Sequence, residues 1–373
     1  YNNDENYVEY LYNPNGYLYR VTDSYAGTST YYEYDLAGRN VASSVSGGTI
    51  YNPIASGTTS YEDGTGLVDR QTTTIYTTNG EVAKHLTYLY DYCDATAAGG
   101  AEAIISMSVN GEAYQYEYDS LGRLIKKKTS VASESENSNI LTQLKTGKRE
   151  EYTYVNNANG TTTTLIKTFR DMLGVLHTYE YDANGNITSE IIGEGANVEY
   201  KTYYYDSQNR LIRYNDSELN TTITYIYDSR GNILNYTLYE YAAGESALDE
   251  STADPYDYAY NNSTWKDLAT TIMGESISYD AVGNPRKWQG HRSLTWQNGR
   301  QLLSVSKSGS GVEYSYNGDG LRTSKSGGRN TEYIILDGTY LGEKTTINGT
   351  EYLIVYIYGA EGSVIGIEVN GTP

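Results

Sequence analysis

The side chains that could do chemistry in this chain are mainly carboxylates, because its 373 residues include 47 Asp and Glu but only 3 His and 1 Cys. A pair of carboxylates could hydrolyse a glycoside by acid–base catalysis. The conspicuous aspartates, however, recur at one position of a repeated pattern, which turn geometry explains better than catalysis does. Clustered turn aspartates could also bind calcium, but no EF-hand-like spacing is present. We therefore predict no catalytic residues and no metal site.

The histidines and the cysteine do not have the spacing of a catalytic or metal-binding site. His85, His177 and His291 are isolated in the sequence, so we interpret them as surface or lumen residues. Cys93 is the only cysteine, which excludes an internal disulfide and favours a small buried side chain over a reactive thiol. Phosphate-loop, dinucleotide and nucleophile-elbow motifs are incomplete. The sequence thus predicts a protein that is not an enzyme and binds no cofactor.

The charge of the chain excludes two classes of partner. Its formal net charge is -20 and its pI is near 4.5, which argues against nucleic acid and against an anionic membrane surface. The longest apolar run, residues 352–358, is too short to span a bilayer, and no signal peptide is visible. Because the chain opens inside repeat-like sequence, we expect it to be a fragment of a longer protein.

A Tyr-x-Tyr-Asp pattern returns along the chain, usually with Gly three residues after the Asp and then Arg or Asn. Equivalent aspartates are 24 residues apart from Asp182 to Asp206 and 22 apart from Asp206 to Asp228. A fixed period indicates stacked small units. The signature positions, which we interpret as structural, are Tyr32, Tyr34, Asp35, Gly38, Arg39, Tyr116, Tyr118, Asp119, Gly122, Arg123, Tyr179, Tyr181, Asp182, Gly185, Tyr203, Tyr205, Asp206, Arg210, Tyr225, Tyr227, Asp228, Gly231, Tyr279, Asp280 and Gly283.

Each repeat is expected to form a β-hairpin. The Tyr-x-Tyr alternation places both rings on one face of a strand. Asp then supplies a side-chain acceptor for a type I turn, Gly closes the turn, and a second strand follows. Opposite ends of the hairpins carry turn signals of their own at Asn79-Gly80, Asn110-Gly111 and Asn348-Gly349.

The aromatic composition predicts how these hairpins assemble. The chain has 44 Tyr and 1 Phe, and a Tyr ring suits a position that is half in contact and half wet. We therefore expect a sheet one layer deep, in which neighbouring hairpins pair edge to edge and stack Tyr on Tyr. Because native sheets twist, a long ribbon of this kind should coil. The expected fold is a single all-β array over residues 1–373, in which antiparallel β-hairpins coil into a spiral shell or open barrel-like wall.

Three segments interrupt the pattern. Residues 94–112, 130–148 and 242–257 are expected to be longer loops, with Asp254-Pro255 in the last of them. Ser263 to Ile272 is expected to form one or two helical turns.

The full motif Tyr-x-Tyr-Asp-x-x-Gly-Arg stands at Tyr32 to Arg39 and at Tyr116 to Arg123, and the chain resembles the YD-repeat, or RHS, family over nearly its whole length. Its final third, with Ile277 to Pro285 and Thr295 to Arg300, is similar to wall-associated YD-repeat proteins of Gram-positive bacteria. The resemblance implies a coiled β-hairpin shell. Such shells enclose a variable C-terminal effector in polymorphic toxins and serve adhesion in teneurins. The repeated Asp-Pro-x-x-Gly element of self-cleaving members is absent, so self-cleavage is not implied.

These observations predict a structural role. We expect a non-catalytic shell segment of a secreted or surface-bound, wall-associated bacterial protein, with a cargo domain beyond Pro373 as its partner. One alternative is adhesion to cell-surface glycans, for which Trp265, Trp288 and Trp296 are the candidate residues. Another is self-association through open strand edges into a tube or filament.

Overall fold

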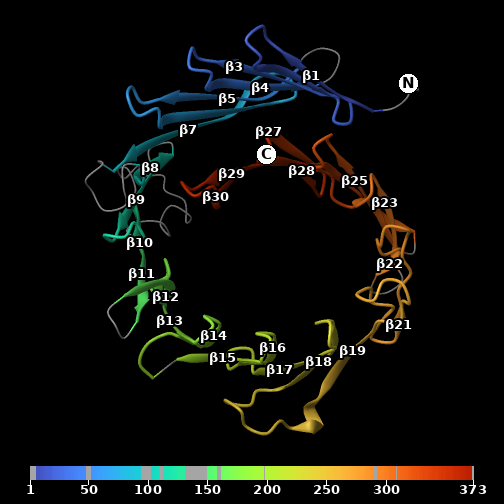
Figure 1. The fold of residues 1–373 in the computed structure, drawn as a ribbon. Coiled ribbons are helices and arrows are strands. Elements are labelled where there is room, and N and C mark those ends of the chain that lie inside the picture. Colours follow the sequence, from blue (N-terminus) through green and yellow to red (C-terminus); the bar gives the residue numbers. More distant parts are fainter. Residues whose placement is uncertain are drawn as a thin grey trace. The chain divides into compact units, whose positions relative to one another are not determined.

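The computed structural model describes residues 6–47, 52–93, 102–109, 112–130, 149–157, 161–196, 198–288, 292–307 and 309–371. These residues form β-strands joined by turns, and within them there is no α-helix and one 3-10 turn, η1 (Glu250–Thr252) (Figure 1). The all-β hairpin array that the repeats predict is confirmed. In the described ranges no helix is long and apolar enough to cross a membrane.

The strands up to residue 130 include those of the signature motifs at Tyr32 to Arg39 and at Tyr116 to Arg123. They are β1 (Val8–Tyr12), β2 (Leu18–Asp23), β3 (Thr28–Tyr34), β4 (Asn40–Gly47), β5 (Asn52–Tyr61), β6 (Val68–Tyr76), β7 (Val82–Tyr92), β8 (Ile104–Val109), β9 (Glu112–Tyr118) and β10 (Leu124–Ser130).

The central strands follow the same alternation of strand and turn. They are β11 (Arg149–Asn156), β12 (Thr162–Arg170), β13 (Leu176–Tyr181), β14 (Ile187–Ile192), β15 (Glu199–Tyr205), β16 (Leu211–Asp216), β17 (Thr221–Tyr227), β18 (Ile233–Glu240), β19 (Asp254–Ala259), β20 (Thr271–Ile272) and β21 (Glu275–Ser276).

The last strands form a second sheet. They are β22 (Lys287–Trp288), β23 (Arg292–Gln297), β24 (Gln301–Lys307), β25 (Ser310–Tyr316), β26 (Arg322–Ser326), β27 (Thr331–Leu336), β28 (Thr339–Ile347), β29 (Thr350–Tyr358) and β30 (Val364–Gly371).

The strand pairing is that of a chain of hairpins. Within the runs β1 to β8, β10 to β21 and β23 to β30, each strand pairs antiparallel with the next strand along the chain. Each turn joins strands that are neighbours in the sequence, so local turn chemistry can direct this topology. The chain divides into two compact units, unit 1 (Tyr1–Ala95, Ala101–Ala113 and Gly290–Pro373) and unit 2 (Thr96–Gly100 and Tyr114–Gln289).

Unit 2 has the expected single layer over most of its length. Its buried apolar side chains within the described ranges are Tyr114 and Tyr116, near the start of the unit. Among the described residues from 117 to 288, the side chains on both faces are polar or partly exposed. A sheet of this kind uses Tyr because one edge of the ring stays wet while its face packs on a neighbour.

Unit 1 contradicts the prediction of one layer throughout. Strands β4 and β5 pack against β27 of the second sheet, and a dry core lies between the layers. The core is formed by aliphatic residues, which the large excess of tyrosine in the composition did not indicate. They are Val45, Ala55, Ile75, Leu86, Ile334, Leu336, Val355 and Ile357.

Three predictions about interruptions need correction. The segment 94–112 contains strand β8, and strand β19 begins at Asp254, inside the predicted loop 242–257. Asp254 and Pro255 are therefore in a strand, which pairs with β18. Tyr256 of this strand stacks on Tyr236 with ring centres 4.5 Å apart, and this contact holds the strand in place. Residues 263–272 form turns and β20, without a helical turn. Residues 131–148, Asn110-Gly111 and His291 lie outside the described residues.

Two of the turns predicted at the opposite ends of the hairpins are confirmed. Asn79-Gly80 closes the β6–β7 hairpin and Asn348-Gly349 the β28–β29 hairpin, each at the end opposite to the neighbouring Tyr-Asp turns. Asn348 and Gly349 both have positive φ, at 51° and 83°, as a type I′ hairpin turn requires.

Candidate functional site

The signature aspartates are turn residues, as predicted, and their carboxylates organise the turn. In the β9–β10 hairpin, Asp119 Oδ1 accepts the backbone N–H groups of Leu121 (2.9 Å) and Arg123 (3.0 Å). Asp119 Oδ2 accepts Arg123 Nε at 2.7 Å, so the guanidinium is held by the carboxylate of its own turn. The same contacts recur between Asp35 and Arg39 and between Asp206 and Arg210. The Asp and Arg of the motif thus form one hydrogen-bonded ion pair.

This Asp–Arg pair contacts the following hairpin through a tyrosine. The guanidinium carbon of Arg123 lies 4.1 Å from the ring centre of Tyr154, and the Tyr154 hydroxyl donates to the carbonyl of Leu124 at 2.7 Å. We call this set, the turn Asp, its Arg and the Tyr of the next hairpin, the hairpin latch. A cation over an aromatic face is favourable, and the hydroxyl satisfies a carbonyl just after the turn. The latch recurs as Asp35–Arg39–Tyr61 and Asp206–Arg210–Tyr227.

The hydroxyl bond persists where Asn replaces Arg. Asn186 donates to Asp182 Oδ2 at 2.9 Å, and the Tyr205 hydroxyl donates to the carbonyl of Ile187 at 2.9 Å. Asn232 and Asn284 bond their turn aspartates in the same way. Further hydroxyl-to-carbonyl bonds between hairpins are made by Tyr92, Tyr181, Tyr279, Tyr316 and Tyr340. A Phe cannot make this bond, which gives a physical reason for the excess of Tyr.

The sequence interpretation missed two parts of this arrangement. It treated Tyr as a half-wet ring and did not assign a partner to its hydroxyl, although the ratio of Tyr to Phe was the available signal. It also missed the turn at Asp171, whose Oδ1 accepts the N–H groups of Leu173 and Val175, both at 2.8 Å. Arg170 stands there where Tyr precedes Asp elsewhere, so the pattern is broken.

The latch also sets the charge of the turn carboxylates. The Arg123 side chain, by its hydrogen bond, lowers the pKa of Asp119, and the Arg210 side chain lowers the pKa of Asp206 in the same way. The Asn186 amide lowers the pKa of Asp182. These carboxylates therefore remain ionised at neutral pH, which a charge-assisted turn needs.

Replacing Tyr154 by Phe should weaken unit 2 by about 0.5–1.5 kcal/mol, because one interhairpin hydrogen bond is lost and a carbonyl loses its partner. The matched control is Tyr12→Phe, since Tyr12 is 61% exposed and its hydroxyl bonds no described residue. Denaturant unfolding of both variants measures the difference. Equal stabilities for the two variants would show that the hydroxyl contributes nothing.

Two aromatic side chains cover turn glycines. A Cβ on Gly38 would lie 2.4 Å from the Tyr17 hydroxyl oxygen, and one on Gly283 would lie 2.8 Å from the Trp265 ring. Contacts this short require the aromatic ring to move. Both glycines also have positive φ, at 81° and 87°, which favours Gly at the turn.

Gly38→Ala should therefore destabilise the chain more than Gly185→Ala. Gly185 has nearly the same φ, 85°, but a Cβ there meets nothing within 4 Å. The control isolates backbone strain of about 1 kcal/mol, and the difference between the variants reports the displaced ring. Thermal unfolding of the two proteins measures it. If Gly185→Ala lowers the unfolding temperature as much as Gly38→Ala does, the contact with Tyr17 does not contribute to the cost of the substitution.

Tyrosine rings pack on one another across strands, between neighbouring hairpins as predicted for Tyr17 and Tyr34, and also within single hairpins. Ring centres are 5.0 Å apart for Tyr17 and Tyr34, 5.1 Å for Tyr203 and Tyr214, and 6.3 Å for Tyr225 and Tyr236. Tyr225 and Tyr227 lie on the same face of β17, 6.5 Å apart. Pairs of this kind contribute roughly 0.5–1.5 kcal/mol beyond area burial.

The other signature tyrosines have varied surroundings. Tyr116 is buried. Burial and the Glu190 carboxylate raise the pKa of Tyr179 to about 12. Tyr32 lies beside Asp337, and burial together with this carboxylate raises the pKa of the Tyr32 phenol.

The two layers of unit 1 are joined by polar contacts around their dry core. Ser43 donates to Asp337 Oδ2 at 2.5 Å, and the N–H of Gly318 donates to Asp23 Oδ2 at 2.7 Å. Lys84 pairs with Glu368, and the N–H of Tyr358 donates to the Tyr88 hydroxyl at 3.5 Å. Each of these contacts joins residues far apart in the sequence. We call this set, with the aliphatic core, the two-layer contact.

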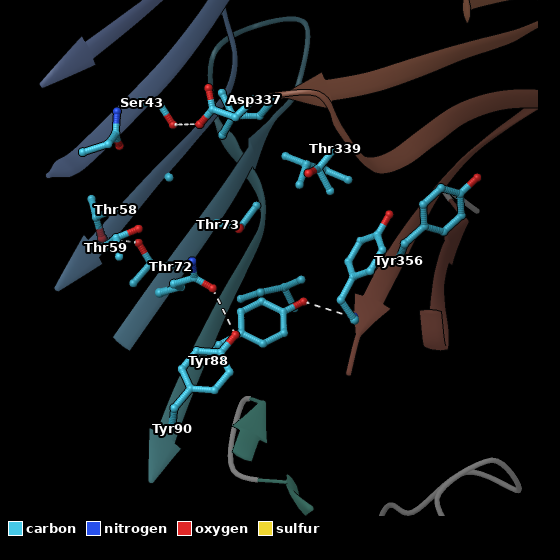
Figure 2. A pocket seen from close by; sticks show the side chains of 17 residues that line it. Ser43, Thr58, Thr59, Thr72, Thr73, Tyr88, Tyr90, Asp337, Thr339 and Tyr356 are labelled. Carbon is cyan, nitrogen blue, oxygen red and sulfur yellow. Dashed lines mark hydrogen bonds between the residues drawn. The ribbon is translucent and has the colours of Figure 1, made fainter. Parts of the chain in front are cut away.

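A cavity of about 250 Å³ lies beside this contact. Figure 2 shows Ser43, Tyr88 and Tyr90 on one side of it, and Asp337, Thr339 and Tyr356 on the other. Burial raises the pKa of both Tyr90 and Tyr356 to about 12, so the phenols are neutral at ordinary pH. The lining has no histidine, cysteine or basic residue. The arrangement can hold water or a small polar molecule.

The remaining candidates are separate from one another. His177 contacts Glu190 at 2.9 Å, and His85 contacts Thr74 at 2.8 Å. Cys93 is buried. Trp265 and Trp288 are 43% and 41% exposed, whereas Trp296 is half-buried. Among the described residues, no cluster of three or more His, Cys, Asp or Glu could hold a metal. Glycan binding by the tryptophans stays a prediction.

Comparisons with known proteins identify the class of fold. No protein-family model matches this chain, and no curated protein sequence does. The crystal structure of TcdB2-TccC3-TEV is 13% identical, with a TM-score of 0.51, and the match covers 98% of this chain. The crystal structure of TcdB2-TccC3 is also 13% identical, with a TM-score of 0.49 over 95% of this chain. Each match covers 22% of the solved chain, so this chain spans about a fifth of their length. The likeness to TcdB2-TccC3-TEV supports the RHS-like fold that the repeats indicate.

Proposed function

We propose that this chain is a non-catalytic segment of a structural shell that encloses or presents an effector following residue 373. The observation that carries the proposal is the hairpin latch, which joins successive hairpins through side chains at their turns. An enzyme needs one well-built site, whereas a wall needs the same contact many times. The RHS-like fold, found over nearly the whole chain, supports the same conclusion.

The mechanism is mechanical. Backbone pairing closes gaps between strands, the latch fixes the angle between hairpins, and partly wet tyrosine faces let a thin sheet persist without a thick core. The acidic surface keeps the assembly soluble. We place the protein outside the cell, secreted or at a bacterial surface, because the repeats resemble those of wall-associated proteins.

Electron cryomicroscopy of the chain tests this role directly. Projections with a hollow centre are expected, and a solid, filled particle would contradict the shell.

A protease experiment tests enclosure. The same unstructured, lysine-containing polypeptide is fused after Pro373 in one protein and before Tyr1 in its matched control. Trypsin should cut the fusion after Pro373 about tenfold more slowly, because cleavage follows the population of accessible chain. Equal cleavage rates would show that the chain does not enclose a polypeptide fused after residue 373, and they would not contradict the fold.

A further inference from the structure

A groove of about 550 Å³ lies on the second sheet of unit 1, and one arginine is its only charged lining residue. Strands β25, β26, β27, β28 and β29 each supply side chains to it. The polar side chains that line it are Tyr316, Arg322, Tyr333, Tyr340, Tyr356 and Tyr358. The other three lining residues, Gly320, Leu321 and Val364, bring no polar side chain. The groove is therefore a tyrosine surface around one positive charge.

Arg322 differs from the arginines of the hairpin latch. In the latch, the carboxylate of the turn holds Arg39, Arg123 or Arg210. The turn before Arg322 begins with Asn317, and Arg322 stands one position later than the latch arginine does. Within the described part of the chain, no carboxylate lies within 4.0 Å of its guanidinium nitrogens.

The charge of Arg322 lies among tyrosines and faces no carboxylate of the described residues. Its guanidinium carbon is 4.2 Å from the ring centre of Tyr314 and 5.8 Å from that of Tyr316. The Nε atom is buried and has no hydrogen-bond partner among the described residues. A partly buried cation without a carboxylate is unfavourable by itself, and a planar guanidinium favours a bidentate oxyanion. In a chain of net charge -20, the absence of a carboxylate here is unusual.

The tyrosine hydroxyls define the rest of the ligand. The hydroxyls of Tyr316, Tyr340 and Tyr358 already donate to backbone carbonyls of neighbouring hairpins. Each can then only accept a further hydrogen bond, so a ligand must bring donors. The Tyr356 hydroxyl donates to Glu343, and this carboxylate is paired with Arg329 at 3.5 Å. Tyrosine faces also suit the apolar side of a sugar ring.

From these contacts we propose that the groove binds a hydroxylated carboxylate of the uronic-acid type. The carboxylate pairs with Arg322, and the hydroxyls of the ligand donate to the tyrosine oxygens. This inference does not depend on the proposed shell function. It adds a ligand site on the second sheet of unit 1.

Titration of the full chain with glucuronate, at low ionic strength and followed by NMR, tests the proposal. Glucose is the matched ligand, since it differs only in having a hydroxymethyl group in place of the carboxylate, and it should bind at least about tenfold more weakly. Arg322→Gln should lose glucuronate binding by about tenfold or more, while Arg300→Gln, at an exposed arginine, should not change it. Equal binding of glucose and glucuronate, or full binding by Arg322→Gln, would overturn the proposal.

Two further measurements keep the test decisive. Arg322→Lys retains the charge but not the bidentate fork, so it should bind glucuronate with an intermediate affinity, and it serves in place of Arg322→Gln if that variant does not fold. A tetraglutamate peptide offers carboxylates without sugar hydroxyls. If the peptide binds more tightly than glucuronate, the assignment of a hydroxylated ligand is wrong.

Discussion

Leu336→Ala should destabilise unit 1 by about 2–5 kcal/mol, because a leucine buried between two layers leaves a cavity when it is truncated. Leu336 is 6% exposed, and its Cδ2 lies 3.3 Å from where a Cβ on Gly57 would be. It therefore packs directly on the opposite layer. Denaturant unfolding measures the effect.

Leu303→Ala is the matched control for this prediction. Leu303 lies on β24 of the same sheet but is 39% exposed, so its truncation should cost no more than about 0.5–1 kcal/mol. If the two variants have the same stability, strands β4 and β5 do not pack on β27 in solution. Loss of stability in Leu336→Ala alone would establish the two-layer contact.

Alkaline pH should unfold the chain cooperatively between about pH 10 and 12. Burial raises the pKa of Tyr90, Tyr179, Tyr203 and Tyr356 to about 12 in the folded chain, whereas an unfolded tyrosine ionises near 10. A group whose folded pKa is raised contributes stability that is complete below the unfolded pKa. That contribution is lost as the pH rises from the unfolded towards the folded value. Several tyrosines act in the same direction, so the sum is large.

Absorbance of tyrosinate and circular dichroism, recorded together against pH, check this expectation. Sheet loss and phenol ionisation should coincide for the buried tyrosines. Tyr203→Phe should reduce the alkaline loss of stability, while Tyr12→Phe, at an exposed position, should leave it unchanged. Ionisation of all tyrosines near pH 10 with the sheet intact would contradict the prediction.

Much of the hairpin architecture could be predicted, because its signals are local. Tyr32 and Tyr34 fall on one face by strand alternation, and Asp35 and Gly38 form the turn that follows them. The strand at Asp254 could not be predicted in this way. Its acidic, turn-rich flank resembles a loop, and the stacking of Tyr256 on Tyr236 decides the outcome.

The candidate sites follow the same division. The Asp–Arg half of the hairpin latch lies within five residues, so the motif already contains it. The tyrosine half comes from the next hairpin, as Tyr154 does for Arg123, and no spacing in the motif indicates which carbonyl its hydroxyl bonds. The free charge of Arg322 appears only when its surroundings are known.

The sequence by itself determined the hairpins, their turns and the excess of tyrosine, since period-two alternation and turn chemistry act over a few residues. Only the tertiary structure decided that one part of the chain has two layers. The bond between Ser43 and Asp337 joins residues 294 positions apart, and contacts across such a distance leave no local pattern. The aliphatic core there depends on which faces meet, which is a property of the folded chain.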